Sequence, residues 1–351
     1  MTHPPAAPAP TMHSLTDFFE HLGLQWRLQD CGVRLQPVAR HDWRQIEAGE
    51  RPYPFPYLGQ AHLAFILWAE DRVHAPNIWW FKLPLDEQGL LSLAERDGLL
   101  RQLVDALARN VAAAQAGQTP KGLLEHNPYV WQANDNQLAM LHARLTAQLK
   151  LPASQFHADA LHYLKQGPWE HWQALGLQGL ADVVARVDEP DHRKALNSAI
   201  AGLPSPVLVS ICQLLEHQPI GASLSQAIVD RLSRACDDQL AVEINVCLRA
   251  LAASEASGLI DRALALALAT PLDAEALVTL ATRHGTRLAH SALATPYLEQ
   301  IAALGQLAFN RIMAELLFQP GQRAQWLANF RATDRSDRLG SAIGGLLSHT
   351  H

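Results

Sequence analysis

The pattern of apolar and polar positions changes character near residue 155. Before this point, short runs either alternate apolar with polar residues or are apolar throughout, as in β-strands, and Pro and aromatic residues are frequent. From about Phe156, apolar residues recur at intervals of three and four within Ala- and Leu-rich segments that Pro, Gly or Asp separates. The first pattern predicts a mixed α+β domain, and the second predicts stacked helix pairs.

The first pattern places an α+β domain at residues 12–115. Its first element is a short amphipathic helix over Ser14–His21 with Ser14 as N-cap. Alternation on both sides of Asp30-Cys31-Gly32 predicts a β-hairpin, and two later apolar runs predict buried strands. A capping-box sequence at Ser92 then starts a helix that reaches about residue 115. The four strand segments are 25–29, 33–38, 61–68 and 78–83. We expect one small antiparallel sheet with helices packed against it.

The second pattern predicts a helical-repeat domain over residues 156–330, reached through a connector and one helix at 116–155. Helix pairs are expected to begin near Trp169, Pro206, Asp238 and Leu272, at intervals of 37, 32 and 34 residues. These intervals are typical of α-solenoid units. The repeats share little sequence identity, so the prediction of a HEAT-like α-solenoid rests on periodicity alone. The chain as a whole is expected to be mainly α-helical.

Both ends of the chain are predicted to be tails. Residues 1–11 are rich in Pro and Ala, which predicts disorder, and the sequence leaves open whether translation starts at Met1 or Met12. Residues 331–351 begin with a mixed charge run and contain the glycine-rich segment Gly340–Gly344, which predicts a loose C-terminal end.

Charge and composition restrict the kinds of partner and the cellular location that we expect. The net charge is −6 and neither half is basic, with 13 basic and 15 acidic residues up to Lys150, so nucleic acid and anionic membranes are disfavoured. No apolar run approaches the ~18–20 residues that span a bilayer, and the N-terminus does not resemble a signal peptide. Four Cys without CxxC spacing are expected to be reduced core residues, so we expect a cytoplasmic protein.

Motifs that carry chemistry are missing from the sequence. It has no HExxH, GxSxG, GxGxxG or GxxxxGK[ST] pattern, so no catalytic residue or cofactor is assigned. Among 17 His, the pair His157 and His162 is five residues apart, which separates the side chains by about 140° around a helix. No metal site is therefore predicted.

The most unusual local feature is the loop Arg51–Tyr57, in which three aromatic residues alternate with Pro. In the strand that follows, Trp79 and Trp80 must point to opposite faces of a sheet. Two interpretations remain open: these aromatics fill the core, or they line a binding groove. Candidate binding residues are Tyr53, Phe55, Tyr57, Trp79, Trp80, Lys82 and Asp86, the last adjoining Glu87 in a charged turn.

Three segments, Asp30–Arg34, Arg51–Pro54 and Ile78–Gly89, resemble a family of uncharacterised bacterial proteins of about 340 residues, mainly from gammaproteobacteria and classified as a domain of unknown function. The resemblance implies a single bacterial cytosolic unit from Met12 onward. It carries no activity, cofactor or site residue that could be transferred.

Two hypotheses of function follow. The first is a non-enzymatic interaction, regulatory or scaffold protein that binds another protein along its helical-repeat surface. The alternative is an enzyme or small-ligand-binding protein with its site in the N-terminal domain near Lys82 and Asp86. The partner's identity and the oligomeric state stay open.

Overall fold

The computed structural model describes residues 12–73, 76–115, 122, 124–125, 127–167 and 171–348. The described chain divides into two compact units. The first comprises the residues up to Gly32 together with those from Pro37 to Gln132, and the second comprises Val33–Gln36 and everything from Ala133 onward. Four residues from the N-terminal part of the sequence thus belong to the second unit.

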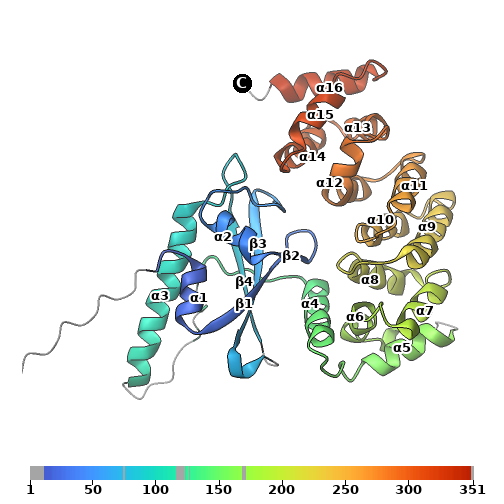
Figure 1. Cartoon of the computed structure of the whole chain (residues 1–351). Helices are drawn as coiled ribbons and strands as arrows, with labels where there is room; N and C mark the ends of the chain where they lie inside the picture. The colour runs from blue at the N-terminus through green and yellow to red at the C-terminus, as the bar shows by residue number, and fades with distance from the viewer. Residues whose placement is uncertain are drawn as a thin grey trace, which may run out of the picture. The chain divides into compact units, whose positions relative to one another are not determined.

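A four-stranded sheet forms the centre of the first unit, with strand order β2-β1-β3-β4 (Figure 1). The central strand β3 pairs antiparallel with both of its neighbours, so that Phe65 lies opposite Leu28 of β1 and Trp79 of β4. The strands are β1 (Leu24–Asp30), β2 (Gln36–Val38), β3 (Gln60–Ala69) and β4 (Asn77–Pro84). The helices are α1 (Leu15–His21), α2 (Arg40–Glu47), the 3₁₀ turn η1 (Glu70–Arg72) and α3 (Leu93–Gln115).

One face of this sheet forms the core, because alternate residues of the strands point to the same side. Phe65 is fully buried at its centre, with ring centroids 5.0 Å from Phe19 of α1 and 5.4 Å from Trp43 of α2. The buried Leu99 and Leu103 of α3 belong to the same apolar cluster. The predicted small sheet with packed helices is confirmed. Helix α2 was not predicted, because only Trp43 and Ile46 mark its apolar face.

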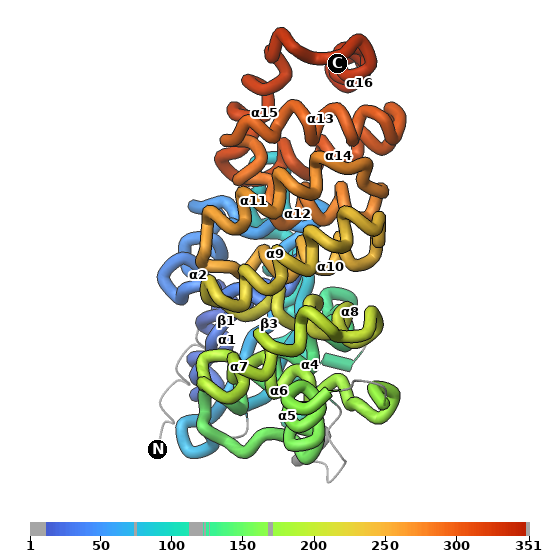
Figure 2. The backbone as a smooth tube through the Cα atoms, turned by 90° about the vertical axis from the view of Figure 1, so that its right-hand side faces the viewer, coloured from blue at the N-terminus to red at the C-terminus, as the bar shows by residue number. Residues whose placement is uncertain are grey.

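From Ala133 onward, the described residues of the second unit form helices joined by loops, with an isolated bridge between Ile220 and Ser254. The even-numbered helices α4 to α16 each contact the next even-numbered helix, and α5, α7, α9 and α11 form a second row that contacts them (Figure 2). The helices are α4 (Asp135–Gln148), α5 (His157–Gln166), η2 (Trp172–Ala174), α6 (Leu177–Ala185), α7 (Pro190–Ala199), α8 (Ser205–Leu215), α9 (Ala222–Asp237), α10 (Ala241–Leu251), α11 (Ser257–Leu268), α12 (Ala274–Ala289), α13 (Ala294–Ala303), α14 (Gln306–Phe318), α15 (Arg323–Asn329) and α16 (Asp337–Ser348).

Successive helix pairs in this unit begin at Ser205, Ala241, Ala274 and Gln306, at intervals of 36, 33 and 32 residues. The first three lie within three residues of starts predicted from the sequence, whereas the predicted start at Trp169 falls outside the described residues. The mainly helical second half is therefore confirmed.

Three expectations need correction, and a fourth falls outside the described chain. The predicted tail at 331–351 contains α16, which packs against α13 and α14 through the buried Leu339, Ala342 and Ile343. Helix α4 contacts α6 and belongs to the second unit, so this unit begins before the predicted boundary at 156. The predicted strand at 33–38 shortens to Gln36–Val38. The expected disordered tail at 1–11 lies outside the described residues. No helix in the described part of the chain is long and apolar enough to cross a membrane.

Candidate functional site

The predicted binding loop is divided between core and periphery. Tyr53 is fully buried, and its hydroxyl donates a hydrogen bond of 2.6 Å to Asp30 Oδ1. This residue is part of the core and is out of reach of a ligand, which corrects its selection as a binding residue. Phe55, whose ring lies 6.3 Å from that of Tyr53, is partly buried against the same apolar cluster, and Tyr57 is also partly buried.

Trp79 and Trp80 point to opposite faces of the sheet, as expected from the strand geometry. Trp79 packs on the core face, with ring centroids 5.9 Å from Phe19 and 6.3 Å from Phe81. Trp80 packs on the other face against Trp131, at 5.9 Å.

An aromatic cluster of Tyr57, His62, Trp80 and Trp131 forms on this second face. The ring centroid of His62 lies 4.9 Å from Trp131 and 5.8 Å from Tyr57. Lys82 stands opposite His62 in the β3–β4 register, and burial followed by the charge of Lys82 lowers the pKa of His62. The neutral imidazole and the rings around it make a largely apolar patch with one cation beside it.

Asp86 has a local role. Its Oδ1 accepts hydrogen bonds of 2.9 Å from the backbone N–H groups of Gln88 and Leu90, and Gly89 supplies the positive φ of +77° that the turn needs. These contacts account for an aspartate at this position of the turn. Of the predicted binding residues, the structure therefore joins Tyr57 and Trp80 in the aromatic cluster, with Lys82 next to it.

An unusual carboxyl group, that of Asp30 at the end of β1, was not predicted from the sequence. Its side chain is fully buried on the core face, because it alternates with Trp26 and Leu28 along the strand. Burial raises its pKa to about 8, although hydrogen bonds from Tyr53 and the Gly32 backbone act in the opposite direction. The strict alternation with two apolar residues was a signal that could have revealed it.

In the second unit, a buried carboxylate gathers several cations, and we call Glu216, His217, Arg34, Arg249 and Arg283 the Glu216 cluster. The Glu216 side chain is 1% exposed, and it accepts one hydrogen bond from Arg249 and one of 2.6 Å from Arg283 Nε. Burial raises the pKa of Glu216, but the charge of Arg283 and the hydrogen bond and charge of Arg249 outweigh it and lower the pKa overall.

Arg34 and Leu35 belong to this unit and complete the cluster. Arg34 donates to the backbone carbonyls of Glu216 and Ala252, both at 2.6 Å, and its pKa is lowered first by burial and then by neighbouring arginines, against the pull of Glu216. The Leu35 N–H donates to His217 Nδ1 at 3.1 Å. Burial lowers the pKa of His217 to about 4 although Glu216 opposes it, so the ring is neutral at pH 7.

This cluster could not be predicted from the sequence, because Arg34 lies 182 residues before Glu216 in the chain. No local spacing marks any of them. Only the packing of α8, α10 and α12 brings their side chains together.

Large apolar side chains recur at one edge of the even-numbered row. Val242 in the first turn of α10 is 59% exposed, Val278 near the start of α12 is 44% exposed, and Leu307 at the start of α14 is 66% exposed. We call these residues, with the exposed Leu240 before α10, the apolar edge. A hollow of about 320 Å³ between the starts of α10 and α12 is lined partly by Ala241, Ile244 and Pro271.

Hydrogen bonds fix the alignment of these helix starts. Asn245 of α10 donates to Glu275 Oε1 at 2.8 Å and accepts from Thr279 Oγ1 at 2.6 Å, both in α12. The first turns of the two helices therefore lie at the same edge of the unit. Among the described residues, no group of three or more His, Cys, Asp or Glu could hold a metal ion.

Comparison with known proteins identifies a family. A family model described as "protein of unknown function (DUF3549)" matches residues 10–347, and the chain belongs to this family. No curated protein and no solved structure matches the chain.

Proposed function

We propose that this member of the DUF3549 family is a non-enzymatic interaction protein, and that its second unit acts as an α-solenoid that binds another protein along the apolar edge. The observation that carries the proposal is the repetition of exposed Val242, Val278 and Leu307 near the starts of three successive helices of one row.

A single exposed Val or Leu needs no explanation, because much of any protein surface is apolar. Exposed apolar residues within the first five positions of three helices, each of which contacts the next, are different, since stacked helical repeats present extended surfaces. A partner that covers these side chains would gain about 25 cal/mol for each Å² of apolar surface removed from water. The hollow between α10 and α12 supports the proposal, because it is large enough to accept a partner side chain.

A double substitution, Val242→Asp with Val278→Asp, tests the proposal. Both side chains are exposed, so we expect the unfolding free energy to change by less than about 0.5 kcal/mol. Quantitative affinity capture from the native cell should then lose one stoichiometric partner, because two carboxylates would be buried against an apolar surface.

The matched control is Val73→Asp with Val111→Asp, which makes the same chemical change at exposed positions of the first unit. This control should capture the partner as the wild type does. Equal recovery with both double variants would contradict the apolar edge as the binding surface.

The aromatic cluster offers a second candidate, a small-ligand site in the first unit. The supporting observation is His62 Nδ1, which is buried without a hydrogen-bond partner within the described residues. Direct binding of a small ligand that is lost with Trp80→Ala and kept with the apolar-edge variant would favour this candidate.

A further inference from the structure

A second pocket lies at the C-terminal ends of α10 and α12, away from the apolar edge on which the proposed function rests. It has a volume of about 670 Å³ and is bordered by the ends of α10 and α12 and the start of α11. A volume of this size is typical of small-molecule sites, which run from about 300 to 1,000 Å³. The lining is Ala252, Ser254, Ile260, Asp261, Arg283, His284, Thr286, Arg287, His290 and Ser291.

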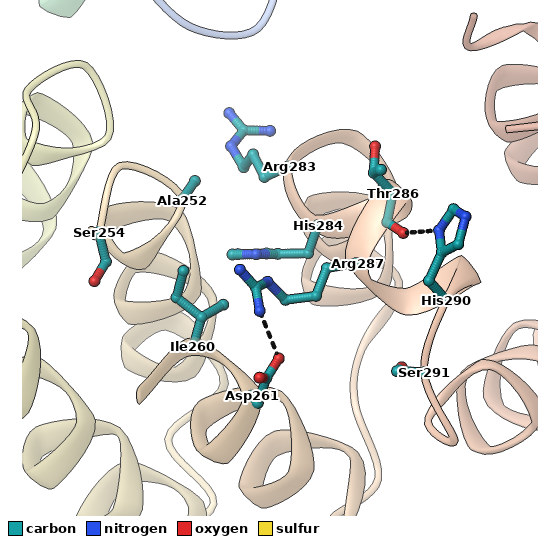
Figure 3. Close-up of a pocket in the computed structure, with 10 residues that line it drawn as sticks. All are labelled: Ala252, Ser254, Ile260, Asp261, Arg283, His284, Thr286, Arg287, His290 and Ser291. Atoms are coloured by element: carbon teal, nitrogen blue, oxygen red, sulfur yellow. Dashed lines mark hydrogen bonds and ion pairs between the residues drawn. The ribbon is translucent and has the colours of Figure 1, made fainter. Parts of the chain in front are cut away.

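Polar and charged groups dominate this lining. It contains two arginines, three hydroxyl groups and two histidines, but one carboxylate, that of Asp261. Figure 3 shows Arg283, His284 and Arg287 projecting from α12 toward the side of Ala252 and Ile260, whereas His290 points the other way. We infer that this pocket binds a small molecule through a carboxylate or phosphate group held by Arg287 and Arg283.

Arg287 is available to such a ligand. Its Nη1 lies 2.8 Å from Asp261 Oδ1, but the Asp261 side chain is 57% exposed, and exposed ion pairs contribute little to stability. Within the described residues, Nε and Nη2 of Arg287 have no hydrogen-bond partner. A ligand oxyanion that makes paired hydrogen bonds to this guanidinium would displace Asp261.

Arg283 links the pocket to the Glu216 cluster. Its Nε is held by Glu216 and its Nη1 donates to Thr282, which leaves Nη2 without a partner among the described residues. In the cluster, Arg249 and Arg283 bond the carboxylate of Glu216, whereas Arg34 donates to the backbone carbonyls of Glu216 and of the pocket residue Ala252. Three arginines in this cluster thus outnumber its one carboxylate. Their positive charge is incompletely compensated away from water, which is costly, so the binding of an additional anion is favoured.

The competing explanation is that Arg287 only stabilises the C-terminal end of α12, whose helix dipole favours cations. The same dipole would repel a bound anion, but it is weaker than charge-assisted hydrogen bonds, so two arginine contacts would outweigh the repulsion.

Isothermal titration calorimetry of the full chain with pyrophosphate and with citrate tests the inference. We expect at least one of the two to bind, and the stronger of them identifies phosphate or carboxylate as the preferred group. Arg287→Ala should weaken binding about 10- to 100-fold, because it removes charge-assisted hydrogen bonds.

Two further variants separate binding from structure. Asp261→Asn should strengthen binding about two- to fivefold, since it frees Arg287 from its competitor; a purely structural ion pair predicts no such gain. Arg262→Ala removes an exposed arginine of α11 that does not line the pocket, and it should bind like the wild type. The inference is wrong if neither anion binds to the wild type or to Asp261→Asn, or if Arg287→Ala and Arg262→Ala behave alike.

Discussion

Asp30 is a carboxyl group whose protonation departs strongly from its ordinary state. Its carboxyl group has a pKa of about 8 in the folded chain because it is fully buried, compared with 3.8 when it is exposed. Between these two values the folded state keeps the proton and the unfolded state loses it. The free energy of unfolding therefore falls as the pH rises from about 4 to about 8, and this contribution levels off above pH 8.

Asp30→Asn tests this expectation. The amide is nearly isosteric with the protonated carboxyl group and can still accept from the Tyr53 hydroxyl. Urea denaturation of both proteins should show that the variant gains stability relative to the wild type, by an amount that grows from about pH 5 to about pH 8. A difference that does not change with pH would mean that Asp30 is ionised in the folded protein.

The sequence predicted on which face of the sheet a strand residue lies better than it predicted the role of each residue. Alternation placed Trp79 with Phe81 on one face and Trp80 on the other, as found. It could not show that Tyr53 faces inward, because the backbone path of a Pro-rich loop is set by its long-range contacts. The hydrogen bond from Tyr53 to Asp30 spans 23 residues and leaves no local signal.

At the scale of elements, α16 shows how a glycine-rich segment can mislead. Glycine lowers helix propensity by about 1 kcal/mol, so Gly340, Gly344 and Gly345 suggested a loose end. Tertiary packing compensates, because the small residues allow close approach: a Cβ atom placed on Gly345 would lie 2.5 Å from the Gln306 side chain. Packing information of this kind is not present in the local sequence.

Leu339→Ala tests whether α16 is an integral part of the second unit. Leu339 is 1% exposed, so its truncation should lower the free energy of unfolding by about 2–5 kcal/mol in chemical denaturation. The control Leu347→Ala changes a side chain of the same helix that is 48% exposed, and it should cost less than about 0.5 kcal/mol. Similar small losses for both would show that α16 contributes little to the folded unit.

At the scale of the molecule, the change of pattern near residue 155 predicted a mixed unit followed by a helical one, but it placed their boundary too late. The amphipathic period of α4 does not indicate to which unit the helix belongs. Its contact with α6 assigns it to the second unit. The sequence could not predict that Val33–Gln36 belongs to the second unit either, because the hydrogen bond from Arg34 to Glu216 joins residues 182 positions apart. The Glu216 cluster depends on this distant pair.

Site-specific photocrosslinking in the native cell tests the proposed function most directly. A photoreactive residue replaces Val278 of the apolar edge, and a second protein carries it at Val111 of the first unit, which is similarly exposed. The account predicts one discrete crosslinked product from position 278 that is absent from position 111, because a partner covers the apolar edge. No product above the level of position 111, with the same result at positions 242 and 307, would contradict the account.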